Sequence, residues 1–150
     1  MAQSLVRNLM HIIFSTKNRK PLIIPSVREE LKAYLIGTLR NFESPSVETN
    51  CVDNHVHILC SVSRKIVLMT LLEKLKKTSS KWIKSKGPAL QGFYWQAGHG
   101  GFSVSPSNVP AVCEYIRQQD AHHRTMTFED EYRAFLRKHG IAFDERYVWD

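Results

Sequence analysis

The chain has 150 residues, the usual size of one domain, and this length is sufficient to bury a hydrophobic core. Its 21 Lys and Arg residues outnumber its 14 Asp and Glu residues, and the net charge of +7 favours a polyanionic partner such as a nucleic acid. Three cysteines without C-x-x-C spacing argue against a disulfide framework and a cysteine-rich zinc site, and no apolar run is long enough to span a bilayer. We therefore expect one domain over residues 1–150 that works in the cytoplasm and has no membrane contact.

The first half of the chain alternates between patterns typical of strands and of a helix. β-branched and aromatic residues predict the strands, and apolar residues at helical spacing predict the helix. The pattern Ser26-Val27-Arg28-Glu29 is a capping box, which indicates where that helix begins. Asp53-Asn54 is a pair suited to the tight turn of a hairpin. The expected elements are a strand over 5–16, a helix over 26–42, and two strands over 46–52 and 55–62.

A basic amphipathic helix is expected next. Apolar residues recur at helical spacing over 66–83, and lysines occupy much of the remainder. Eight basic residues and one acidic residue fall between Arg64 and Gly87, so the rest of the chain has no net charge. The glycine-rich run 98–101 then indicates a mobile loop or one that a ligand approaches, and a short strand over 102–105 follows.

Two further helices are expected to end the chain. Ser107 or Asn108 is suited to cap a short helix that continues towards His123, and Thr127 is suited to cap a helix that Gly140 ends. The order β-α-β-β-α-β followed by helices resembles the split β-α-β arrangement. We therefore predict an α+β fold of the ferredoxin-like or RRM-like type, with helices packed on an antiparallel sheet and a C-terminal helix that carries Tyr115.

The sequence His55-Val56-His57 is a candidate metal site. Alternate residues of a strand point to one face, so two imidazoles stand side by side there. The alternative is a pair of surface histidines on a solvent-facing strand, which is the commoner fate of an isolated H-x-H pattern. Apolar residues around the pair, such as Val52 and Ile58, instead place it at the start of a buried central strand.

Tyr115 and Gln119 are candidate partners of that pair. They are four residues apart on a predicted helix and therefore share one face. A phenol is a poor nucleophile at neutral pH because its ordinary pKa is about 10, so it needs a nearby cation. The alternative is a core tyrosine beside a solvated glutamine.

Two groups of basic residues are candidates for contact with DNA phosphates. Lys74, Lys77 and Lys81 share a helical face at spacings of three and four residues. Lys17 and Arg19 form a second patch near the end of the first strand. The alternative for the helix is a solvated lysine face without a partner.

Taken in order, these motifs resemble the single-tyrosine HUH transposases that serve insertion sequences of the 200/605 type. The resemblance runs from His11-Ile12-Ile13-Phe14 to the tail and covers nearly the whole chain. The matching motifs are Asn54-His55-Val56-His57-Ile58-Leu59, Trp95-Gln96, Phe102-Ser103-Val104-Ser105, Tyr115-Ile116-Arg117-Gln118-Gln119-Asp120-Ala121-His122-His123 and Phe128-Glu129-Asp130-Glu131-Tyr132.

The resemblance implies a function and a role for each candidate. His55 and His57 carry over as metal ligands, Gln119 as the third ligand, and Tyr115 as the nucleophile that becomes linked to DNA. The reaction implied is cleavage and rejoining of single-stranded DNA at the hairpin ends of an insertion sequence, through a 5′-phosphotyrosine intermediate. Mg²⁺ is the implied ion, and we expect Mn²⁺ to substitute because imidazole is softer than Mg²⁺ prefers. No nucleotide cofactor is required.

The resemblance also implies a homodimer, in which the tyrosine helix often completes the site of the other subunit. Whether this chain uses the cis or the trans arrangement is left open by the sequence. A catalytically silent DNA- or RNA-binding module is the alternative from another class. A host-domesticated protein that processes chromosomal repeats, or a fragment of a plasmid-type relaxase, would share the chemistry but use another DNA target.

Overall fold

The structure is a computed structural model that describes residues 2–150. Its strands are β1 Leu9–Ser15, β2 Ser46–Cys51, β3 His55–Ser61 and β4 Gly100–Ser103. Its α-helices are α1 Pro25–Asn41, α2 Leu68–Lys84, α3 Val109–Arg117, α4 Gln119–His122 and α5 Phe128–Lys138. Short 3-10 turns lie at Lys17–Arg19, Pro88–Leu90 and Pro106–Asn108. Among these described residues, no helix has the length and apolar character needed to cross a membrane.

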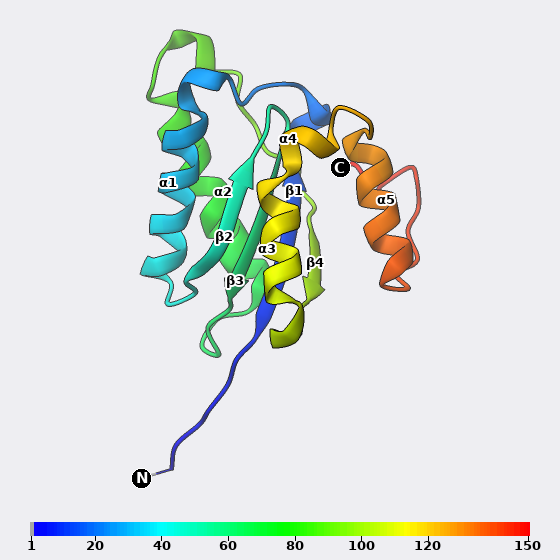
Figure 1. The fold of residues 1–150 in the computed structure, drawn as a ribbon. Helices are drawn as coiled ribbons and strands as arrows, with labels where there is room; N and C mark the ends of the chain where they lie inside the picture. The colour runs from blue at the N-terminus through cyan, green and yellow to red at the C-terminus, as the bar shows by residue number, and fades with distance from the viewer. Residues whose placement is uncertain (1) are drawn as a thin grey trace.

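The strands form one antiparallel sheet in the order β2-β3-β1-β4 (Figure 1). This is the strand order of the split β-α-β arrangement, so the predicted α+β fold is confirmed. β1 and β3 lie in the centre and pair along their whole lengths, with Ile13 opposite His57. The hairpin between β2 and β3 turns at Asp53-Asn54, as predicted, because the Val52 N–H donates to the His55 carbonyl across it. The central strands therefore hold the histidine pair rigidly.

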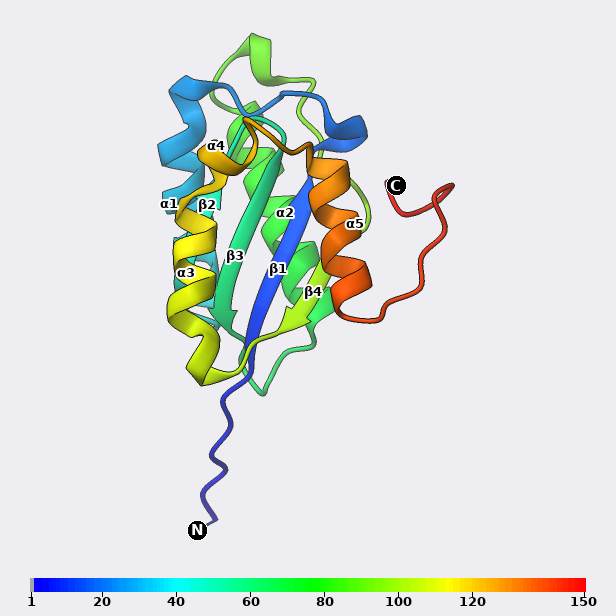
Figure 2. The same ribbon diagram turned by 45° about the vertical axis from the view of Figure 1, so that its right-hand side comes forward.

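Helices cover both faces of the sheet (Figure 2). Alternate residues of β1 and β3 point to opposite faces. One set, which includes Phe14 and Ile58, packs against α1 and α2 in the largest apolar cluster. The other set faces α3 and α5, where two smaller clusters form around Leu59 and Ile13. The histidines of β3 belong to the second set, so they lie beneath α3 and α5.

Several boundaries differ from the sequence prediction, and β4 spans Gly100–Ser103 where a strand over 102–105 was predicted. The first strand begins at Leu9 and not at residue 5, because the preceding residues run away from the sheet and have no partner strand (Figure 1). The prediction that a capping box at Ser26 begins the helix is wrong. Ile24 is the N-cap of α1 and Pro25 occupies the first turn, where its missing N–H costs nothing, and no side chain caps the helix.

The predicted helix towards His123 is divided in two. Gln118 has φ −88° and ψ 15°, which ends α3 and lets α4 begin at Gln119. The side chain of Asn108 makes no cap hydrogen bond. Asn50 of β2 donates to the Ile116 carbonyl at 2.9 Å and ties α3 to the sheet one residue after Tyr115. The break turns Gln119 inwards while α3 keeps Tyr115 over the central strands.

The last helix, α5, is capped as predicted and packs on the edge strand. Thr127 accepts a hydrogen bond from the Asp130 N–H at 3.2 Å, and Gly140 follows the helix with φ 65°. The aromatic ring of Tyr132 lies directly against Gly100, where an added Cβ would be only 2.6 Å from the ring. The glycines predicted to form a mobile loop therefore include β4 residues that permit this close approach.

Candidate active site

Three histidines from the two central strands meet beneath α3 and α5. His55 and His57 of β3 point to the same face, and both are buried. His11 of β1 lies diagonally across from His57, and its Nε2 is 2.8 Å from Nδ1 of His57. The predicted pair, His55 and His57, therefore lies on one face of the strand as expected. The pairing of β1 with β3 brings a third imidazole, His11, which was not predicted.

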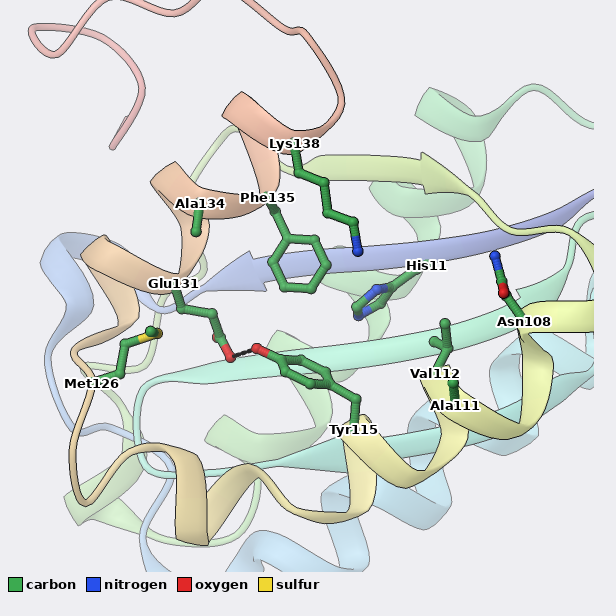
Figure 3. A pocket seen from close by; sticks show the side chains of 10 residues that line it. All are labelled: His11, Asn108, Ala111, Val112, Tyr115, Met126, Glu131, Ala134, Phe135 and Lys138. Atoms are coloured by element: carbon green, nitrogen blue, oxygen red, sulfur yellow. Dashed lines mark hydrogen bonds between the residues drawn. The ribbon is translucent and has the colours of Figure 1, made fainter.

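Tyr115 approaches the histidines from α3 of the same chain. Its hydroxyl donates a hydrogen bond to Oε2 of Glu131, which comes from α5 (Figure 3). Its ring lies at 5.9 Å from that of His57, measured between centroids, and stacks on His122 at 4.5 Å. In this structure of one chain, the tyrosine and the histidine pair lie together.

Glu131 is the point on which the site converges. Its Oε1 is 3.0 Å from Nε2 of His57, 3.2 Å from Nε2 of His123 and 3.5 Å from Nε2 of His55. The carboxylate is almost completely buried. A buried carboxylate requires compensating donors or a cation, and here imidazoles surround it.

Gln119 also reaches this centre, at the start of α4. Its Oε1 is 3.2 Å from Nε2 of His55 and 3.0 Å from Nε2 of His123. Its Nε2 donates to the carbonyl of Tyr115 at 3.3 Å, which fixes the orientation of the amide. The structure therefore brings together all four residues singled out in the sequence for chemistry: His55, His57, Tyr115 and Gln119.

The charges at this centre are shifted by burial and by the mutual contacts. Burial lowers the pKa of His57 to about 4, and the Glu131 hydrogen bond offsets this only in part, so its imidazole is neutral at pH 7. Burial opposes the charge of Glu131, but hydrogen bonds from His123, His55 and His57 outweigh it and hold the pKa of the carboxyl well below its usual range. Burial likewise lowers the pKa of His123, yet the hydrogen bond and charge of Glu131 raise it overall. The centre therefore contains a carboxylate.

The phenol of Tyr115 is held in its protonated form. Burial raises its pKa above the ordinary value, and the negative charge of Glu131 raises it further. A cation beside Glu131 would reverse the second effect, because it would cancel the charge that disfavours phenolate. A positive ion between the carboxylate and the imidazoles would therefore favour the phenolate form of Tyr115.

The donor atoms fit such an ion. One atom each from His55, His57 and Glu131 lies within 4.8 Å of the others, and all three residues are buried. Adjacent ligands at about 2.1 Å from an octahedral ion are about 3.0 Å apart, close to the spacings at Glu131 Oε1. Nδ1 of His55 is 2.7 Å from Oδ1 of Asn54, and in the tautomer that donates from Nδ1 to this oxygen the Nε2 atom presents a lone pair. This lone pair faces the acceptor oxygens of Gln119 and Glu131. A cation placed between these three atoms would bind all of them.

The comparisons with known proteins identify a family and a shared fold. The family described as Transposase IS200 like matches residues 5–119. The chain belongs to this family. A candidate transposase of Deinococcus radiodurans shares the fold with a TM-score of 0.61 and 22% identity, covering 79% of this chain and 98% of its own. A REP-associated tyrosine transposase, solved bound to a REP hairpin, has a TM-score of 0.61 and 11% identity over 82% of this chain and 73% of its own. No curated protein matches the sequence.

The predicted DNA-contacting residues of this IS200-like transposase are not all near the tyrosine. Lys74, Lys77 and Lys81 are exposed on α2, which packs on the sheet face opposite to α3 and α5 (Figure 2). Lys17 and Arg19 follow the end of β1, and Arg19 forms a 2.9 Å ion pair with Glu129 of α5. The second patch therefore adjoins the helix that supplies Glu131, whereas the lysine face does not.

Sequence reasoning assigned no catalytic or metal-binding role to His11, His123 and Glu131 of the transposase. Glu131 lies at helical spacing from Phe128 and Phe135, so it was an isolated acid on the apolar face of a predicted helix. His123 is one helical turn beyond Gln119, and His11 is an isolated polar residue in an apolar strand. A lone charged or imidazole side chain on a predicted buried face was the available signal.

Proposed function

We propose that the chain is a single-tyrosine HUH transposase that cleaves and rejoins single-stranded DNA with a divalent metal. The observation that supports this most strongly is that Tyr115 contacts the buried Glu131, which also contacts the buried His57. Family membership supports a transposase, and the centre supplies the chemistry that such an enzyme needs. We also propose that residues 1–150 act as one domain in the cytoplasm.

His55, His57 and Gln119 are the proposed metal ligands, with Glu131 as a fourth. The ion, when bound, withdraws charge from a phosphate oxygen and orients the phosphorus. Mg²⁺ is the proposed physiological ion, and Mn²⁺ substitutes because two imidazoles contribute to the donor set. His11 is not a proposed ligand. Its Nε2 contacts Nδ1 of His57, and this contact orients the His57 ring so that the Nε2 atom of His57 points to the metal site.

Tyr115 is the proposed nucleophile. Its phenolic oxygen forms a bond to phosphorus, the bond from phosphorus to the 3′ oxygen breaks, and that oxygen leaves as a 3′-hydroxyl after taking up a proton. The phenol proton leaves along the existing hydrogen bond to Oε2 of Glu131. The product is a 5′-phosphotyrosine, and attack by another 3′-hydroxyl reverses the step without a nucleotide cofactor.

The proposed substrate is single-stranded DNA with hairpin ends. The REP-associated neighbour was solved with a hairpin, which supports this class of substrate for a chain of the same fold. Lys17 and Arg19 would contact phosphates beside the site, and the lysine face of α2 (Lys74, Lys77 and Lys81) would contact DNA that continues around the molecule. A homodimer, with the tyrosine helix acting in cis or in trans, remains part of the proposal.

The test uses labelled single strands from the flanks of the gene, with Mg²⁺ or Mn²⁺, followed by denaturing electrophoresis. The wild-type protein should form an adduct that survives denaturation, and Tyr115→Phe should form none while it still binds the DNA. Tyr147→Phe, at a tyrosine that is 64% exposed, is the matched control and should behave as wild type. Binding without any adduct, on both strands and with both metals, would favour the silent DNA-binding module.

A further inference from the structure

A groove of about 490 Å³ lies between α3 and α5, directly beside the hydroxyl of Tyr115 (Figure 3). Ala111 and Val112 form one wall on α3, and Ala134 and Phe135 form the other on α5. His11 lies at its floor. The groove is therefore continuous with the centre where phosphate is proposed to react.

The lining of the groove combines flat apolar surface with a few polar groups. The ring of Phe135 is partly exposed and is supported from behind by Phe102, at 5.4 Å between stacked ring centroids. Asn108 offers an amide at one end, and Lys138 places an ammonium group over the groove (Figure 3). An aromatic face, an amide and a cation are the groups that bind an unpaired nucleobase and its phosphate.

We propose that this groove binds the unpaired base of the nucleotide that stays joined to Tyr115, directly on the 3′ side of the scissile phosphate. The inference rests on the proposed function. Apolar walls receive the base, Asn108 hydrogen-bonds its edge, and Lys138 contacts the following phosphate. A base in this position would hold the phosphorus in line with the phenol and keep the cleaved strand from leaving.

The side of the cut follows from the geometry of in-line attack. The leaving 3′ oxygen must depart on the side of the phosphorus opposite to the phenolic oxygen of Tyr115, so the 5′ strand leads away from the tyrosine. The retained nucleotide remains bonded to Tyr115 through the phosphorus, and the groove begins beside this residue. A duplex is too wide for a groove of this volume, so the occupant is a single unpaired nucleotide.

One wall of the groove lies beyond the part of the chain that the family match covers. That match ends at residue 119, whereas Ala134, Phe135 and Lys138 belong to α5. α5 therefore adds a base-binding wall as well as Glu131 to the tyrosine helix.

The test combines two changes, made separately and together. Substitutions in the protein fill the groove, and an abasic nucleotide in the DNA removes the base. Ala134 is exposed on α5, so Ala134→Phe fills the groove without burying a larger side chain in the core. Ala111→Phe does the same from α3. Ala33→Phe, at an exposed alanine on α1, is the matched control on the opposite face of the sheet. The DNA is a cleavable strand, with its cut position mapped first, and a copy with an abasic nucleotide directly 3′ of that position.

We expect the abasic strand to form adduct about tenfold more slowly than intact DNA with the wild-type chain, since base stacking on protein contributes on this scale. Ala134→Phe should slow adduct formation on the intact strand by a similar factor. With this variant, the abasic strand should react as fast as the intact strand, because the two changes remove the same contact. 2-Aminopurine at this position should be quenched on binding to Tyr115→Phe, and the added Ala134→Phe change should abolish the quenching.

The groove assignment would be overturned if the wild-type chain formed adduct at equal rates on intact and abasic DNA. It would also be overturned if the effects of Ala134→Phe and of the abasic nucleotide multiplied. In both cases the formation of adduct would still uphold the proposed function. A complete absence of adduct on intact DNA would overturn the proposed function and the groove assignment with it.

Discussion

The two faces of the sheet are built from different chemistry. The face under α1 and α2 buries aliphatic and aromatic side chains such as Ile12, Ile58 and Leu35. The face under α3 and α5 buries imidazoles, an amide and a carboxylate, among them His57 and Glu131. Because β1 and β3 alternate between these faces, the same two strands supply both.

The difference shows how the fold accommodates a costly site. Apolar burial contributes about 25 cal/mol per Å², whereas a buried charge without a partner costs several kcal/mol. One face therefore stabilises the sheet, and the other uses that rigidity to hold groups such as Glu131 that would destabilise an ordinary core. Changes on the two faces should consequently separate stability from activity.

His57→Ala should produce the largest loss of activity. It removes a proposed ligand, so the metal-dependent step should slow about a thousandfold, equivalent to about 4 kcal/mol of transition-state stabilisation. Adduct formation and binding of Mn²⁺ by calorimetry are the measurements. His99→Ala, in the loop before β4, is the control and should change neither. Unchanged cleavage by the His57 variant would refute its role as a ligand.

Leu35→Ala, on the other face of the sheet, should lower stability and leave activity nearly unchanged. The side chain is fully buried between α1 and the sheet, so its truncation should lower the free energy of unfolding by about 2–5 kcal/mol. The rate of adduct formation well below the melting temperature should stay within about twofold of wild type. Urea denaturation measures the first quantity, and a large fall in the adduct rate of fully folded protein would show that the two faces are not independent.

Much of the fold was predictable because it depends on local patterns. The period of two along residues 55–62 and the turn at Asp53-Asn54 were sufficient to predict the hairpin, and helical spacing predicted α1, α2 and α5. The capping box at Ser26 failed because Pro25 is better suited to the first turn of the helix. The break at Gln118 was not predicted, since it is set by how α3 and α4 dock on the sheet.

The candidate site was predictable only where its residues had a motif. His55 and His57 stood out because they alternate, and Tyr115 and Gln119 because they share a helical face. Glu131 had no such partner in the sequence, and its role depends on α5 folding back over β4 and β1. Tertiary packing created that contact, so no local spacing could indicate it.

Acid should destabilise the metal-free protein through the polar face. The folded pKa of His57 is lowered from 6.5 to about 4, so the unfolded chain binds the extra proton between these values and stability falls as the pH drops from 6.5 to 4, by roughly 3 kcal/mol. The lowered pKa of Glu131 continues this trend below its ordinary value, and the raised pKa of His123 acts only above pH 6.5.

Urea denaturation with a chelator, repeated across this pH range, measures the effect. His57→Asn keeps a polar side chain but cannot titrate, so it should reduce the slope between pH 6.5 and pH 4. Burial also lowers the pKa of His11, which should account for part of the slope that remains. A slope equal to that of the wild type would assign the acid sensitivity to other groups.

Lys77→Ala should have the smallest effect. Loss of one phosphate contact on the lysine face of α2 should weaken DNA binding by a few-fold and reduce the salt slope of the binding constant by about 1. The adduct rate at saturating DNA should not change, since this face is remote from Tyr115. Lys32→Ala on α1 is the control, and an identical salt slope in Lys77→Ala would mean that this face is merely solvated.

The most direct test of the account is to locate the covalent bond. Adduct formed on a cleavable single strand is digested with nuclease and protease, and the peptides are examined by mass spectrometry. The account predicts a nucleotide phosphate attached to Tyr115 and to no other residue. Attachment at a different side chain, such as the exposed Tyr147, would contradict the assignment of Tyr115 as the nucleophile.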